Sequence, residues 1–203
     1  MQENNDESTK LKLIEKPEGI PFCVMIDSSY SIKDEHQAAY ASAALQAMEY
    51  AKREGVSNHF AAVNLEESVR CTQWFDSPNR EIGKMLRIHY AGDVEEFDST
   101  PVIDLLSEHQ GQKALLIITS RYYRELSSLV LPDVKLGYIY NQGQKIAMET
   151  GSVGQDLFGA VLPPYNHEFG DVKQGLEMMC EFVDGLKFYG QTGRIDPKNL
   201  AKK

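Results

Sequence analysis

Short apolar runs alternate along this chain with longer segments of helical periodicity. The runs Phe22–Ile26 and Ala114–Thr119 contain almost no polar residue, which is typical of strands that are covered on both faces of a parallel sheet. Similar runs occupy residues 59–65 and 136–140. Together these four runs predict the strands of a mainly parallel sheet.

Amphipathic helices are predicted between the strands. The segment from about Lys33 to Glu54 repeats apolar residues every three or four positions and ends at Gly55, which suits a helix C-cap. Val172–Leu186 repeats the pattern and predicts a final helix. A shorter helix is expected after Thr100, which precedes Pro101 as an N-cap residue would.

The order of these elements indicates the fold class. Residues 69–74 alternate in polarity after a Glu66-Glu67 turn, which predicts an exposed edge strand paired antiparallel through a hairpin. We therefore expect an α/β, doubly wound, mainly parallel sheet with one antiparallel edge strand and helices on both faces. Residues 142–164 are rich in glycine and predict a loop containing at most a short strand or helix.

The length of 203 residues fits one domain, which we expect over residues 20–190, between a flexible N-terminal tail (1–19) and a C-terminal tail (191–203). The composition, 42% hydrophobic and 25% charged, is typical of a soluble globular protein. The net charge of -9 disfavours nucleic acid as a partner because phosphates would be repelled. No apolar stretch suggests a membrane span or a signal peptide, and three scattered cysteines suggest reduced thiols in the cytoplasm.

Oxygen-bearing side chains gather directly after the first predicted strand, in Asp27-Ser28-Ser29-Tyr30-Ser31. Alternate residues of an extended loop project to the same side, so Asp27, Ser29 and Ser31 are expected to converge. Carboxylate and hydroxyl oxygens suit a hard cation such as Mg²⁺ or Mn²⁺, and no His or Cys adjoins them. The alternative is that the two serines only cap the following helix.

A further hydroxyl stands at Thr100, in a loop that a doubly wound sheet would place beside the first. An Asp-x-Ser-x-Ser loop after a buried strand, followed about 70 residues later by a Thr-Pro loop that opens a helix, resembles the von Willebrand factor type A (vWA) domain with its metal-ion-dependent adhesion site (MIDAS). The resemblance covers roughly residues 20–190 and is to the intracellular prokaryotic type of this domain.

The resemblance implies a metal site and a binding role. Ser29, Ser31 and Thr100 would supply hydroxyls to Mg²⁺ or Mn²⁺, Asp27 would supply a carboxylate directly or through water, and an acidic side chain of a protein partner would complete the coordination. The implied function is a non-catalytic protein-interaction module, with neither nucleic acid nor a membrane as partner. Many intracellular relatives act with AAA+ ATPases of the MoxR type, so such an ATPase is the first partner to expect.

One position departs from the family pattern. Where the family has a second Asp after the later buried strand, this chain has Ser120, followed by Arg121. At an effective dielectric constant of ~20, one lost charge pairing is worth on the order of a few kcal/mol, so we expect Ser120 to make the metal site weak. A degenerate vWA domain that binds protein without metal therefore stays open as an alternative.

A second alternative is an enzyme. An Asp at the end of a first buried strand and a later strand ending in Thr119 also resemble the haloacid dehalogenase-type phosphohydrolases, in which Asp27 would attack phosphorus and Thr119 or Ser120 would hold the phosphate. That family carries an acidic residue two positions after the nucleophile, where this chain has Ser29. The missing carboxylate would leave the catalytic Mg²⁺ with few ligands.

Overall fold

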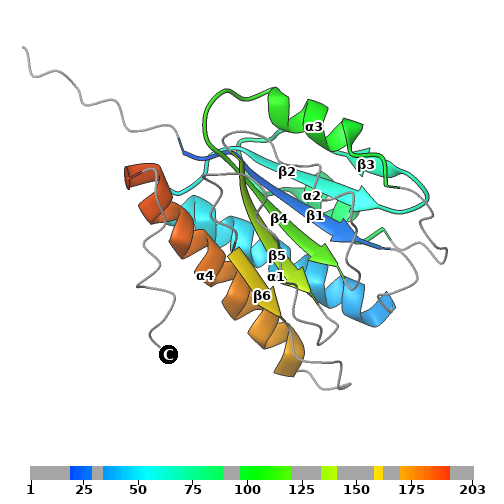
Figure 1. Cartoon of the computed structure of the whole chain (residues 1–203). Coiled ribbons are helices and arrows are strands. Elements are labelled where there is room, and N and C mark those ends of the chain that lie inside the picture. Colours follow the sequence, from blue (N-terminus) through cyan, green and yellow to red (C-terminus); the bar gives the residue numbers. More distant parts are fainter. Residues whose placement is uncertain are drawn as a thin grey trace, which may run out of the picture.

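A six-stranded sheet forms the centre of the structure, a computed structural model that describes residues 19–28, 34–88, 97–119, 134–140, 158–161 and 170–192. The strand order is β3-β2-β1-β4-β5-β6 (Figure 1). All neighbouring strands run parallel except β2 and β3, which are antiparallel. The doubly wound, mainly parallel sheet with one antiparallel edge strand confirms the predicted fold class.

Ten elements make up the described part of the chain. The strands are β1 (Phe22–Asp27), β2 (Phe60–Leu65), β3 (Val69–Cys71), β4 (Lys113–Thr119), β5 (Val134–Tyr140) and β6 (Phe158–Val161). The helices are α1 (Asp34–Arg53), α2 (Arg80–Leu86), α3 (Thr100–Ser107) and α4 (Gly170–Thr192). Strand β6 falls in the segment from which the sequence predicted no more than a short element.

Strand β1 lies between β2 and β4 and is parallel to both. All six of its residues are buried, which explains why its sequence lacks a polar alternation. The chain adds β2 and β3 on one side of β1 and then β4, β5 and β6 on the other. The strand order therefore reverses between β1 and β4, and at such a switch point doubly wound proteins bind their ligands beyond the carboxyl ends of the strands.

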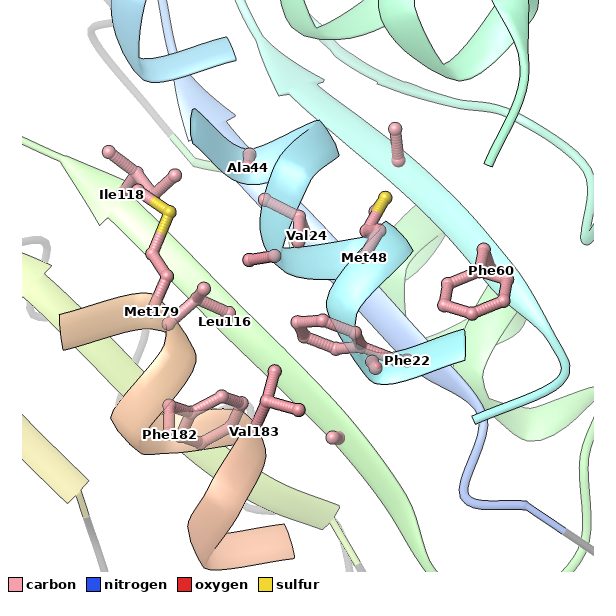
Figure 2. Packing of buried hydrophobic residues seen from close by; sticks show 14 of the residues in the cluster. Phe22, Val24, Ala44, Met48, Phe60, Leu116, Ile118, Met179, Phe182 and Val183 are labelled. Carbon is pink, nitrogen blue, oxygen red and sulfur yellow. The ribbon is translucent and has the colours of Figure 1, made fainter. Parts of the chain in front are cut away.

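Helices α1, α2 and α4 cover one face of the sheet. Figure 2 shows Ala44 and Met48 of α1 packed over β1, and Met179 and Phe182 of α4 against β4. The ring centroids of Phe22 in β1 and Phe182 in α4 are 6.0 Å apart. The long apolar stripes predicted for α1 and α4 are therefore their core-facing sides.

The opposite face packs against α3, which Figure 1 shows across the sheet from α1 and α4. Val102, Leu105 and Leu106 of α3 are buried with Cys23 and Met25 of β1 in a second hydrophobic cluster. Helices therefore lie on both faces, as expected.

Helix α1 ends where the sequence placed its C-cap. Gly55 has a φ of +68°, a left-handed conformation that glycine adopts without steric cost. Its N–H donates to the carbonyl of Lys52 at 3.0 Å, and the N–H of Val56 donates to the carbonyl of Ala51 at 2.9 Å. These bonds satisfy carbonyls that the end of a helix would otherwise leave unpaired.

Within the part of the chain that the structure describes, no helix combines the length and the apolar character that crossing a bilayer requires.

The core packing of α4 predicts a large stability effect at Phe182. The Phe182→Ala variant should lower the free energy of unfolding by about 3–5 kcal/mol, because it leaves a cavity beside Phe22. The neighbouring Glu181→Ala variant, at an exposed position of the same helix, should change it by less than about 0.5 kcal/mol. Urea denaturation measures both, and equal effects would contradict the packing of α4 on the sheet.

Candidate functional site

Asp27 is the last residue of β1 and is fully buried. Side chains alternate between the two faces of a strand, and Cys23 and Met25 point to the face that α3 covers. Asp27 continues that alternation, so its carboxylate belongs to the α3 face, at the carboxyl edge of the sheet. A strand otherwise made of apolar residues thus ends in a buried acid at the switch point.

Thr100 is the first residue of α3 and is exposed. The prediction that it caps this helix is wrong by one position, because Ser99 is the N-cap residue and makes no side-chain capping bond. Asp98 supplies the missing acceptor: its Oδ1 accepts the backbone N–H of Thr100 at 2.9 Å. Hydrogen bonds from the hydroxyl and the backbone N–H of Thr100 hold the pKa of Asp98 below its usual value.

The start of α3 lies at the same end of the sheet as Asp27. Cys71 of β3 pairs with Val63 of β2, and Val63 pairs with Met25, two residues before Asp27. The Sγ atom of Cys71 lies 3.6 Å from the carbonyl oxygen of Pro101, the residue after Thr100. Asp27 and Thr100 therefore share one face and the carboxyl half of the sheet.

The other three predicted ligands, Ser29, Ser31 and Ser120, lie outside the described residues. Ser120 directly follows Thr119, the last residue of β4. Because Ile26 pairs with Ile118, the ends of β1 and β4 come at the same level of the sheet. The roles of the three serines stay predictions.

A polar network around Ser28 was not predicted from the sequence. Ser28, which follows Asp27, is fully buried, and its hydroxyl lies 2.5 Å from Oδ1 of Asn64 and 2.9 Å from the carbonyl oxygen of Leu65. The Nδ2 group of Asn64 donates to the carbonyls of Met85 at 2.9 Å and Ile88 at 3.2 Å. Strand β2, the loop after β1 and the end of α2 are thereby joined.

Only one feature of the sequence points to this network, an amide inside the otherwise apolar run Phe60–Leu65. The pattern gives no hint of its partners, since Ser28 and Met85 are brought to Asn64 by the sheet register and by the packing of α2. Gln37 of α1 adds a second amide donor to the carbonyl of Ile88.

A polar pocket of about 240 Å³ lies at the opposite end of the strands, next to the start of β1. His59 and His109 line it, with ring centroids 4.8 Å apart, and the ring of Trp74 meets His109 edge-on at 4.7 Å. The Nδ1 atom of His59 lies 3.4 Å from Oδ1 of Asp76. This pocket contains neither Asp27 nor Thr100, so it is separate from the predicted site.

The donor chemistry at the carboxyl edge suits a hard cation. Asp27 offers a carboxylate and Thr100 a hydroxyl, and oxygen ligands of this kind bind Mg²⁺ or Mn²⁺. Among the described residues, no group of three or more His, Cys, Asp or Glu side chains is arranged to hold a metal ion. The oxygen atoms of Asp27 and Thr100 are compatible with a site of the predicted type, in which hydroxyls outnumber carboxylates.

Comparison with known proteins identifies the fold. No protein-family model and no curated protein matches the sequence. The structure is similar to that of a von Willebrand factor type A protein from Catenulispora acidiphila, with a TM-score of 0.53 and 11% sequence identity, over 83% of this chain and 43% of that one. This chain thus corresponds to less than half the length of that protein.

Two structures of the pilus adhesin SpaC from Lactobacillus rhamnosus GG are more distant. Their TM-scores are 0.41 and 0.46, with 10% and 6% identity, over 51% and 87% of this chain and 15% and 30% of theirs. The similarity to the Catenulispora protein shows that the chain has a vWA-like fold.

Proposed function

We propose that this chain is a non-catalytic protein-interaction module that binds its partner through Mg²⁺ or Mn²⁺ at the carboxyl edge of the sheet. The cation would be held by Asp27, Ser29, Ser31 and Thr100. Ser120 would be a fifth ligand, at the place of the family's second Asp. The observation that supports this most is the buried carboxylate of Asp27 on the face and in the carboxyl half of the sheet where Thr100 begins α3. When bound, the cation would supply a positive charge that an acidic side chain of the partner can ligate.

Asp98 orients the hydroxyl group of Thr100 for binding the cation. By accepting the hydroxyl and amide hydrogens of Thr100, it leaves the lone pairs of the hydroxyl oxygen available to a cation. Asp98 is exposed, so its charge also adds to the attraction for a cation near the start of α3.

Ser120 stands where the vWA pattern has a second Asp, so the module alone should bind the cation weakly. The carboxylate of the partner would then supply the missing charge, so that metal and partner bind cooperatively by linkage. An AAA+ ATPase of the MoxR type is the partner that we propose to test first.

The metal site predicts a specific loss on removal of the Asp27 charge. In a calorimetric titration with Mn²⁺, Asp27→Asn should weaken binding by at least about tenfold, equivalent to about 1.4 kcal/mol. Asp76→Asn is the matched control, because Asp76 is exposed at the opposite edge of the sheet. Equal affinity of the unmodified chain and Asp27→Asn would remove Asp27 from the site.

Capture of partners separates the alternatives. Proteins retained by the immobilised chain in Mg²⁺ should be lost in EDTA and by the Asp27→Ala, Ser29→Ala double variant. Retention of the same proteins in all three conditions would favour the degenerate domain that binds without metal. Turnover of p-nitrophenyl phosphate that disappears in Asp27→Asn would favour the phosphohydrolase instead.

The contact between Thr100 and Asp98 predicts a measurable pKa change. Because the pKa of Asp98 is lowered, its ionised form contributes stability above the usual aspartate pKa of about 3.9, and this contribution is lost as the pH falls through the lowered value. Thr100→Val removes the hydroxyl donor and should raise the pKa of Asp98 towards the usual value in an NMR titration. Thr100→Ser keeps the donor and should leave the pKa low. An unchanged pKa in Thr100→Val would contradict the hydroxyl bond.

A further inference from the structure

We propose that Asn64 is a positioning residue for the metal site, which it serves by holding Ser28 in place without touching the cation. This inference rests on the proposed function, because it assigns a role towards the same cation. Ser28 stands between two of the proposed ligands, Asp27, which β1 holds in place, and Ser29, so the position of the Ser28 backbone determines where the chain continues to Ser29.

The contacts of Ser28 leave its position little freedom. Its backbone N–H donates to the carbonyl of Leu65 at 2.9 Å, which extends the pairing of β1 with β2 one residue beyond the strand. Its hydroxyl reaches Oδ1 of Asn64 at 2.5 Å, a short distance for a bond between neutral groups. The loop that would carry the serine ligands is thus attached to β2 by both backbone and side chain.

Asn64 is itself fixed from the other side. Its Nδ2 group donates to the carbonyls of Met85 and Ile88 at the end of α2, so each end of the amide has a partner. Ile88 precedes Thr100 along the chain, and its carbonyl also accepts from Gln37 near the start of α1. The amide therefore connects Ser28, the residue after β1, to Met85 and Ile88 at the end of α2.

The side-chain amide of Asn64 is not needed for the stability of the fold. Asn64 is fully buried in β2, where its polar group must be desolvated. Replacing hydrogen-bonded partners in a core by apolar groups of the same shape is often nearly neutral for stability, whereas a fully satisfied polar network selects one arrangement of its members. The residues around metal ligands commonly serve to orient them in this way.

Two serines allow a matched test. Ser28→Ala removes the hydroxyl bonded to Asn64, and Ser57→Ala removes another buried hydroxyl, which donates to the carbonyl of His59 at 2.9 Å at the opposite edge. Both variants should lower the urea midpoint, because each loses a buried hydrogen bond. Only Ser28→Ala should also weaken Mn²⁺ binding, by about 10–100-fold, and Ser28→Thr should recover part of the affinity.

The outcomes separate the two proposals. Equal Mn²⁺ affinity in Ser28→Ala and Ser57→Ala, with normal binding by the unmodified chain, would overturn the role of Asn64 and leave the metal site standing. Absence of Mn²⁺ binding by the unmodified chain, both alone and together with a captured partner, would overturn both. If Ser28→Ala does not fold, Asn64→Leu replaces it, because leucine has a similar size and preserves the apolar packing of β2; normal Mn²⁺ affinity in that variant would equally overturn the inference.

Discussion

The parallel pairing of β1 with β2 on one side and β4 on the other is the constraint on which the rest of the structure depends. A strand bonded on both sides and covered on both faces has no exposed position, which forces it to be apolar along its length. The first polar residues come at the carboxyl end of the strand, at Asp27 and Ser28, and both are buried. The same pairing that buries β1 thus delivers these two side chains to the point where the strand order reverses.

Most of the fold could be predicted because its strands and long helices obey simple periodicities. Mostly apolar runs predicted β1, β2 and β4. Gly55 predicted the end of α1, because a residue without Cβ adopts a left-handed conformation freely. The start of α3 was misplaced by one residue. Ser99, Thr100 and Asp98 are all plausible capping residues, and the choice among them depends on loop geometry that the sequence does not encode locally.

The candidate site rests on a different signal, the regular spacing of a carboxylate and two hydroxyls after a buried strand, which capping of the next helix by the serines would also explain. The structure brings Asp27 and Thr100 to one face and to the carboxyl half of the sheet, whereas the roles of Ser29, Ser31 and Ser120 remain predictions. Asn64 could not have been assigned its partners in advance. They come from the sheet register and from α2, and contacts between residues distant in the chain leave no mark on sequence periodicity.

The edge strand β3 has a consequence for self-association. It is only three residues long, and the exposed Arg70 at its centre forms an ion pair with Glu66. Short, charged edges are poor templates for a strand from another molecule. Intermolecular strand addition, the common route to aggregation of open sheets, is therefore disfavoured on this side of the molecule.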